Sequence, residues 1–276
     1  MESYTDFAEV YDEFMDETPY EEWCERLIWL IKKYGISRPG SEIPSGNLSE
    51  EEKALFSERN LILDLGCGTG TLTEILAEAG FDVMGIDMSA DMLQVAMDKR
   101  EESGHDIMYL CQDMRELDLY GTVDGAVCML DSLSHILHTE DLREIFRRLG
   151  LFIAPDGLLV FDVNTPYKHA HVLGDNHFVF EREEFLCAWR NHYLPATHEV
   201  EIALDFFLEE EDGTYTRYTD TVRERAYSLQ TWKNLLAEAG FDLLAVYDER
   251  RFTEPADDAQ RWVLVARNNA INQKND

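Results

Sequence analysis

The chain has few cysteines and no long apolar run. Its 276 residues include 5 Cys, an odd number, with no C-x-x-C pair among them. This argues against a disulfide framework and a zinc motif, and a reducing cytoplasm is the simplest setting. The N-terminus is acidic and lacks the apolar core of a signal peptide, and no stretch approaches the roughly 20 apolar residues of a membrane span. We therefore expect a soluble protein of the cytoplasm.

Positive charge is also scarce. The chain has 24 Lys and Arg against 56 Asp and Glu, a formal net charge of −32. Binding to nucleic acids and to anionic membranes depends on basic residues, so the composition disfavours both partners. The acidity either serves solubility alone or attracts a cationic partner, and composition leaves this open. With 45% apolar residues the chain can bury a core, so disorder is not expected.

Three glycines at alternate positions follow a short apolar run that predicts a strand. They are Gly66, Gly68 and Gly70. Glycine lets the backbone turn sharply and lets a ligand lie against it. A helix is expected next, with its free N–H groups pointing into the same crevice. In an open parallel sheet, nucleotide-like ligands bind in that crevice, so this stretch predicts a ligand-binding loop.

Two acids beside the loop decide which ligand it suits. A dinucleotide fingerprint needs glycine at position 71, where the chain has Thr71, and the Gly-Lys-Ser/Thr of a phosphate loop is absent. Asp87 ends the next predicted strand, and its carboxylate can accept the protons of two ribose hydroxyls. Asp64, before the loop, suits an ammonium group. A ribose and an amino-acid moiety without phosphates describe S-adenosylmethionine better than NAD.

At this point the chain resembles a known family. Residues 63–70 together with Asp87 resemble the first two motifs of class I S-adenosylmethionine-dependent methyltransferases, and the resemblance covers roughly 58–165 and 228–267. It implies an α/β, Rossmann-like fold with a mostly parallel sheet of seven strands in the order 3-2-1-4-5-7-6, the seventh antiparallel. It also implies S-adenosyl-L-methionine as cofactor and S-adenosyl-L-homocysteine as product, and we expect no metal.

The resemblance implies cofactor contacts from the loop and from the ends of the next strands. Met88 is expected against an adenine face, and Asp113 matches the acid that takes the adenine amino group, with a helix or turn cap as its alternative. Tyr11 lies in a segment similar to one that closes over the cofactor, unless its aromatics only cover the sheet. The expected cofactor contacts are Tyr11, Asp64, Gly66, Cys67, Gly68, Gly70, Asp87, Met88, Asp113, Met114, Leu130 and Ser132.

Candidate catalytic residues follow the apolar run 123–129, which predicts a buried strand. This strand delivers residues 130–135 to the crevice, beside the departing methyl in the family. His135 and the nearest acid, Asp131, are the expected catalytic groups, although His135 would also suit the start of a helix. Methyl transfer is an in-line displacement that needs mainly alignment, and a base is required only if the nucleophile arrives protonated.

Candidate substrate contacts lie further along the chain. Asn164 and Tyr167 follow the strand predicted over 158–163 and could reach the substrate. Arg225 resembles a position that faces the site in similar bacterial enzymes, while a cross-strand pair with an acid is the alternative.

Two other kinds of site are disfavoured. The tetrad Asn/Asp-Pro-Pro-Tyr/Phe of enzymes that methylate nucleic-acid amines is absent, which argues against DNA and RNA bases as acceptors. His169, His171 and His177 come without a carboxylate or thiol at a fixed spacing, so they support a metal site only weakly.

An inserted sheet is expected after the fifth strand. Val200, Ile202 and Leu204 alternate with mostly polar residues, and Asp212-Gly213 predicts a hairpin turn. We expect this sheet to cover the site and to hold substrate choice. The expected parts are an N-terminal helical cap and linker (1–57), a cofactor-binding domain (58–174 and 227–267), the inserted antiparallel lid (175–226) and a disordered tail (268–276).

These observations together favour one function. We expect methyl transfer from S-adenosylmethionine to the nitrogen or oxygen of a small molecule. The alternatives are methylation of a protein side chain, a non-catalytic protein that binds S-adenosylmethionine or S-adenosylhomocysteine, and a nicotinamide-dependent oxidoreductase, which the missing third glycine disfavours. The acceptor and the oligomeric state are not predicted.

Overall fold

The structure is a computed structural model that describes residues 5–40, 60–182, 185–210 and 212–269. The linker expected within 41–57 and the tail beyond 269 lie outside these residues. Seven strands form the main sheet: β1 (Leu61–Leu65), β2 (Asp82–Asp87), β3 (Met108–Cys111), β4 (Val123–Cys128), β5 (Ile153–Asn164), β10 (Phe241–Asp248) and β11 (Arg261–Asn268).

The order of these strands is β10-β11-β5-β4-β1-β2-β3. Strands β1 to β5 pair in parallel, and β11 runs antiparallel to both β5 and β10. With the strands of the main sheet counted along the chain, this is the order 3-2-1-4-5-7-6 with an antiparallel seventh strand. The predicted Rossmann-like topology is therefore confirmed.

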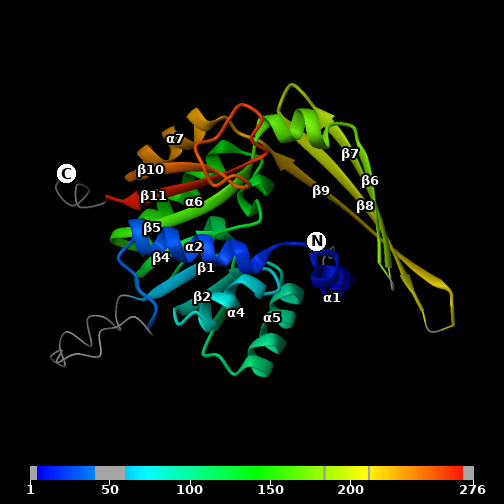
Figure 1. Cartoon of the computed structure of the whole chain (residues 1–276), viewed down its shortest axis with the longest axis horizontal. Helices are drawn as coiled ribbons and strands as arrows, with labels where there is room; N and C mark the ends of the chain where they lie inside the picture. Colours follow the sequence, from blue (N-terminus) through cyan, green and yellow to red (C-terminus); the bar gives the residue numbers. More distant parts are fainter. Residues whose placement is uncertain (1–4, 41–59, 183–184, 211, 270–276) are drawn as a thin grey trace.

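Helices cover both faces of the main sheet (Figure 1). The described helices are α1 (Thr5–Phe14), α2 (Tyr20–Tyr34), α4 (Thr71–Glu78), α5 (Ala90–Ser103), α6 (Thr139–Phe152) and α7 (Leu229–Glu238), with short helical turns η2 (Met114–Glu116), η3 (Ser132–His135) and η4 (Lys168–Leu173). The apolar side chains of α2 and α4 pack on one face, and those of α6 and α7 pack on the other. Each helix does so because its apolar residues recur at spacings of three and four.

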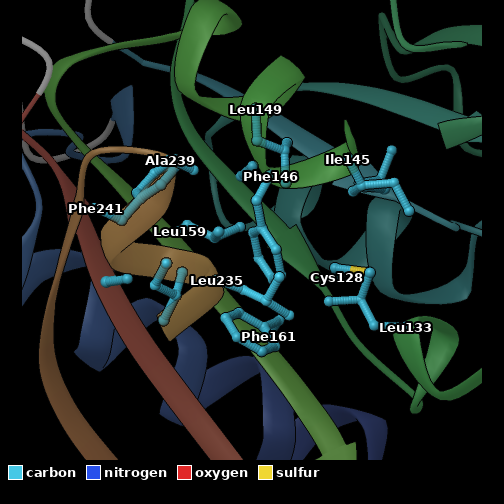
Figure 2. Close-up of a cluster of buried hydrophobic side chains, with 14 of the residues drawn as sticks. Cys128, Leu133, Ile145, Phe146, Leu149, Leu159, Phe161, Leu235, Ala239 and Phe241 are labelled. Carbon is cyan, nitrogen blue, oxygen red and sulfur yellow. The ribbon is translucent and has the colours of Figure 1, made fainter. Parts of the chain in front are cut away.

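The core between α6, α7 and the sheet is rich in aromatic residues. Figure 2 shows Phe146 of α6 above Phe161 of β5, with Leu235 of α7 beside them. The two phenylalanine ring centroids are 5.6 Å apart, and both side chains are fully buried. Burying one such side chain stabilises the fold by about 1.5–3 kcal/mol, so this cluster holds β4 and β5 in place beneath the site.

A second, antiparallel sheet lies between β5 and α7 in the chain. Its strands are β6 (His177–Glu181), β7 (Phe185–Leu194), β8 (Glu199–Glu209) and β9 (Tyr215–Arg225), in that order. The alternating residues Val200, Ile202, Leu204 and Phe206 are buried, as the sequence pattern predicts. The sheet extends beyond the main sheet, and α1 lies between the two (Figure 1). We call this sheet the lid.

Not one helix in the ranges that the structure describes is long and apolar enough to cross a membrane.

Candidate functional site

A cavity of about 410 Å³ lies at the carboxyl ends of β1, β2 and β4. Its wall includes the glycine loop on one side, Tyr11 and Phe14 of α1 on another, and Trp189, Ile202 and Leu204 of the lid. Ligand pockets commonly measure about 300–1,000 Å³, so the volume of this cavity lies within the range of small-ligand sites.

The glycine loop forms one edge of the cavity. Gly66, Gly68 and Gly70 have φ values of 77°, 55° and 74°, which disfavour other residues. A Cβ on Gly66 would lie 2.8 Å from Ser132 Oγ, whereas a Cβ on Gly68 would meet no protein atom within 4 Å. Gly68 lines the cavity, so the space above it is open to a ligand.

Gly70 differs from the other two glycines because it does not line the cavity. A Cβ at this position would lie 2.5 Å from the Tyr109 hydroxyl and 2.9 Å from Cβ of Ala96. Its backbone lies directly before α4. Gly70 therefore allows α4, α5 and β3 to pack closely, and the predicted direct contact with a cofactor does not follow from its position. Cys67 does line the cavity, as predicted.

Asp87 faces the glycine loop from the end of β2. Its Oδ2 accepts a hydrogen bond from the Gly68 N–H at 2.9 Å, and its Oδ1 accepts one from the Ser89 N–H at 2.8 Å. Burial raises the pKa of this carboxyl, while these backbone donors act in the opposite direction. The two bonds fix the carboxylate at the cavity wall, and each oxygen keeps a lone pair for a ligand hydroxyl.

Asp64 lies deeper, at the start of the loop. Its side chain is 2% exposed, and its Oδ2 accepts a hydrogen bond from the Thr73 hydroxyl at 2.6 Å. Burial raises its pKa to about 7, the Thr73 hydrogen bond opposes this shift, and the charge of Asp87 adds to it. Two carboxylates at one wall of a buried cavity make it favourable for a cation.

Met88, Asp113 and Met114, which are expected cofactor contacts, line the neighbouring part of the cavity. The Asp113 carboxylate also caps η2: it accepts hydrogen bonds from the Arg115 N–H and, at 2.5 to 3.0 Å, from the Arg115 guanidinium. The Arg115 side chain holds the pKa of Asp113 below its usual value. The expected contact of Asp113 with an adenine amino group stays a prediction, and the capping role is present.

Helix α1 closes the cavity opposite the loop. Tyr11 lines the cavity, and burial raises its pKa well above the usual value. Its neighbour Asp12 accepts hydrogen bonds from the hydroxyls of Thr69 at 2.7 Å and Thr71 at 3.3 Å, and pairs with Lys99 at 2.6 Å. Helix α1 is thus bound to the loop and to α5.

The same helix contacts the lid. The Phe14 ring packs edge-on against Phe180 and Phe206, with centroids 5.4 and 5.7 Å away. Asp16, just after α1, pairs with Arg182 at 2.8 Å. Helix α1 therefore connects the cofactor loop to the lid across the cavity.

The chain after β4 has an unusual backbone. Leu130 and Asp131 have positive φ values of 59° and 51°, a conformation that costs non-glycine residues energy and is frequent at functional sites. The turn brings Leu130, Ser132 and His135 to the cavity wall, and their expected roles stay predictions. His135 is exposed at the end of η3 and lines the cavity together with residues of the glycine loop and of the lid.

Asp131 is not brought into the cavity wall. Its Oδ2 accepts hydrogen bonds from Arg261 at 2.7 Å and from Asn164 at 2.6 Å, and its backbone N–H donates to Asp162 at 2.9 Å. Arg261 also pairs with Asp162 at 2.6 Å. This ion pair network neutralises Asp131 and fixes the strained turn, so the structure places Asp131 behind the cavity wall, and the expected catalytic role of Asp131 gains no support from this position.

The structure also places Asn164, an expected substrate contact, behind the cavity wall. It is 1% exposed, and its Nδ2 donates to Asp131 and, at 2.6 Å, to Glu224 of the lid. Its Oδ1 accepts a hydrogen bond from Lys168 Nζ at 2.7 Å. Because these neighbours use its donors and acceptor, Asn164 lies one layer behind the cavity wall.

Tyr167 and Arg225 also lie away from the cavity. Tyr167 packs against His171, with ring centroids 4.9 Å apart, and lines a separate hollow near α7. Arg225 donates to the Leu137 carbonyl at 2.7 Å and lies over the Tyr227 ring. Side chains alternate along a strand, and the cavity-facing positions of β9 are even-numbered, which turns Arg225 to the other face.

The sequence interpretation missed the lid residues that do line the cavity. They include Asp220, Val222 and Glu224 of β9, together with Trp189 of β7. The spacing of two between the three β9 residues was the available signal, since it places them on one face.

The charge of the cavity wall is strongly negative. Among the described lining residues, one arginine, Arg115, accompanies five acids, which are Asp64, Asp87, Asp113, Asp220 and Glu224. A pyrophosphate would meet these carboxylates, whereas a ligand with cationic groups and ribose hydroxyls would be attracted. In the described part of the chain, no three His, Cys, Asp or Glu side chains form a group that could hold a metal ion.

The fold and this cavity define a class: a Rossmann-like protein that binds a nucleoside without phosphates. Comparison with known proteins agrees. The model of the methyltransferase domain family matches residues 62–157. A protein of Geobacillus sp. (strain WCH70) that is named as a methyltransferase is 34% identical over 265 residues, covering 96% of this chain and 99% of that protein.

A solved structure is similar over the same length. The S-adenosylmethionine-dependent methyltransferase of Clostridium acetobutylicum ATCC 824 superimposes with a TM-score of 0.77 at 25% identity, covering 96% of this chain and 98% of that chain. A shorter match, 35% identical over 37% of this chain and 38% of the relative, is to glycine/sarcosine N-methyltransferase of Halorhodospira halochloris. The chain belongs to the class I S-adenosylmethionine-dependent methyltransferase family.

Proposed function

We propose that the protein transfers a methyl group from S-adenosylmethionine to a nitrogen or oxygen of a small molecule. The observation that carries this proposal is the continuous cavity that runs from the glycine loop to the lid under α1. A cavity with cofactor-type groups at one end and apolar and acidic lid residues at the other suits two small ligands in line. The Halorhodospira relative, named for glycine and sarcosine, supports a small acceptor.

The residues present fit the cofactor. Asp87, fixed by two backbone N–H groups, would accept hydrogen bonds from both ribose hydroxyls. Asp64 would face the ammonium group, and Met88 and Met114 would flank the adenine. The open space above Gly68 leaves room for the nucleoside against the loop. We do not assign Asp131 or Asn164 a contact with either ligand.

The chain's own groups align the reaction and handle a proton. Bound S-adenosylmethionine supplies a methyl carbon already activated by the sulfonium. The lid and α1 exclude water and hold the acceptor in line with that carbon. His135, exposed at the junction of loop and lid, would take a proton from an acceptor that arrives protonated. The network of Asp131, Arg261 and Asp162 keeps the turn that carries His135 in place.

A methyl-transfer screen tests this function. Labelled S-adenosylmethionine is incubated with the protein and a metabolite extract of the host, and the labelled products are identified by mass spectrometry. We expect label in one or a few small molecules. Label found only in protein, or transfer to no acceptor, would overturn the proposal.

His135→Ala gives a second readout on the product found in that screen. We expect binding of S-adenosylhomocysteine within twofold of the wild type and a fall in turnover of about 100-fold, because the proton acceptor is removed. His138→Ala, three residues away at the start of α6 and outside the cavity wall, is the matched control. Unchanged turnover in the His135 variant would remove this residue from the mechanism.

A further inference from the structure

We propose that the methyl acceptor is an amine, and that Glu224 of the lid, with Asp220 beside it, binds the acceptor nitrogen. This inference rests on the proposed function and names the acceptor class of the same cavity. It assigns a role to two carboxylates that the cofactor does not require.

The first step of the argument is the setting of the two acids on β9. Asp220 and Glu224 lie on the cavity face of the strand, on either side of Val222. Their cross-strand partners on β8 are Leu204 and Val200, which are both buried. The lid wall is otherwise apolar here, and a carboxylate in such a wall is costly unless a partner meets it.

The second step concerns the partners of Glu224. The residue is 6% exposed, and its Oε2 accepts a hydrogen bond from Asn164 at 2.6 Å. Its Oε1 accepts no hydrogen bond from any residue in the described ranges, and no Lys or Arg there forms an ion pair with it. Two cations lie nearby but hydrogen-bond to other residues. Arg261 pairs with Asp131 and Asp162, and Lys168, whose charge acts on Glu224, donates to Asn164 Oδ1 at 2.7 Å. Glu224 Oε1 is therefore left without a hydrogen-bond donor among the described residues, in a side chain that lines the cavity.

Asp220 supplies an independent observation. Its Oδ1 accepts the N–H of Thr221 at 2.7 Å, but its Oδ2 is buried without a hydrogen-bond partner among the described residues. Burial raises the pKa of Asp220, while the charge of His135 lowers it. A buried carboxylate oxygen without a hydrogen-bond partner in a cavity wall indicates that a hydrogen-bond donor of a ligand binds to it.

A buried histidine lies behind Glu224. His169 is fully buried, and its Nδ1 lies 3.0 Å from the His198 carbonyl, which can only accept, so Nδ1 carries a hydrogen. Its Nε2 is 3.4 Å from Glu224 Oε2 and has no hydrogen-bond partner in the described chain. Glu224 thus also contacts an imidazole nitrogen that is out of reach of solvent.

These contacts define a balanced reaction. An ammonium acceptor held by Glu224 and Asp220 transfers one proton to His135, which lines the same cavity, and becomes a neutral amine. The nitrogen lone pair forms the new N–CH₃ bond while the S–CH₃ bond breaks and its electrons stay on sulfur. The products are the methylated ammonium and S-adenosylhomocysteine with a neutral thioether sulfur, with the proton held on His135. Alcohols lack the positive charge that both carboxylates attract.

The test uses a panel of primary and secondary amines, each matched with the alcohol and the carboxylic acid of the same carbon skeleton. Calorimetry of the full-length protein saturated with S-adenosylhomocysteine measures binding, and labelled S-adenosylmethionine measures transfer. We expect binding and transfer for amines only. Transfer to alcohols or acids but not to amines would overturn the amine inference and leave the proposed function standing. Transfer to no panel member and to no host metabolite would overturn both.

Substitutions separate the role of Glu224 from general effects on folding. Glu224→Gln is expected to lower kcat/KM for the amine by about 10- to 100-fold, because a charged hydrogen-bond acceptor is lost, with binding of S-adenosylhomocysteine unchanged. Asp220→Asn should give a smaller loss, mainly in KM. Glu201→Gln, on the same sheet but paired with Arg223, is the control and should change nothing.

If Glu224→Gln does not fold, the amine kinetics of Asp220→Asn test the assignment instead. Amine kcat/KM within twofold of the wild type in a folded Glu224→Gln protein, or in Asp220→Asn if the former does not fold, would contradict the assignment.

Discussion

The three glycines of the loop after β1 all have positive φ, but they need glycine for different reasons. At Gly66 and Gly70 a side chain would collide with Ser132 or with Tyr109. At Gly68 a side chain would meet no protein atom within 4 Å, so a larger residue is disfavoured only by the backbone conformation and by a bound ligand. Single substitutions can separate these two effects.

Gly68→Ala is the informative change, and Gly104→Ala is its matched control. Gly104 ends α5 with φ of 73°, and a Cβ there also meets no atom within 4 Å. Each alanine should lower the free energy of unfolding by about 1–2 kcal/mol, because both residues have a left-handed backbone conformation. Only Gly68→Ala should also weaken S-adenosylhomocysteine binding in calorimetry. Equal affinity in both variants would mean that the ligand does not lie against Gly68.

The buried carboxyl of Asp64 predicts a pH dependence. Burial raises its pKa to about 7, whereas an unfolded aspartate titrates near about 3.9. The folded protein therefore holds a proton that the unfolded chain releases, and the free energy of unfolding falls as pH rises from about 4 to 7. Cofactor binding shows the opposite trend, because only the ionised carboxylate attracts the ammonium group.

Calorimetry with S-adenosylhomocysteine at pH 6 and pH 8 measures that trend. We expect affinity to be about tenfold higher at pH 8. The Asp64→Asn variant should bind more weakly at pH 8 and show a flatter profile, with any remaining slope coming from other groups such as Asp87. The same slope in the variant and in the wild type would contradict the role given to Asp64.

At the scale of elements, α1 connects the glycine loop to the lid. Asp12 contacts Thr69, Thr71 and Lys99, while Phe14 packs among the aromatic residues of the lid. Release of a cofactor from beneath this helix requires these contacts to open. We therefore expect the helix to limit the rate at which a bound cofactor dissociates.

Asp12→Asn tests this function of α1. Loss of the charged acceptor should raise the dissociation rate of S-adenosylhomocysteine about tenfold in stopped-flow measurements, since such a hydrogen bond contributes about 1.5 kcal/mol. Glu22→Gln, which removes an exposed ion pair with Arg26 on α2, should leave the rate unchanged. An unchanged rate in the Asp12 variant would show that α1 does not hold the cofactor.

The elements also show how far a sequence predicts a site. The loop, Asp87 and the buried alternation of β8 were predictable because each depends on neighbours in the chain. The orientation of Arg225 was not, because β9 carries polar residues on both faces, so alternation alone does not tell which face meets the cavity. The role of Asp131 depends on Arg261, a partner far along the chain that no local pattern indicates.

At the scale of the whole molecule, topology assembles the cavity. The parallel strands β1, β2 and β4 end at one edge of the sheet, and the insertion after β5 places the lid over that edge. The resemblance gave the strand order correctly, since the order follows from the family. The carboxylates of the lid were missed because lid sequences do not follow from the strand order.

The central claim is that Asp87 holds the ribose of S-adenosylmethionine beside the glycine loop. The most direct test is the calorimetric affinity for S-adenosylhomocysteine of the wild type and of Asp87→Ala. We predict that the variant remains folded and binds at least about 100-fold more weakly, because two charge-assisted hydrogen bonds of about 1.5–3 kcal/mol each are lost. Equal affinity in a folded Asp87→Ala protein would contradict the account.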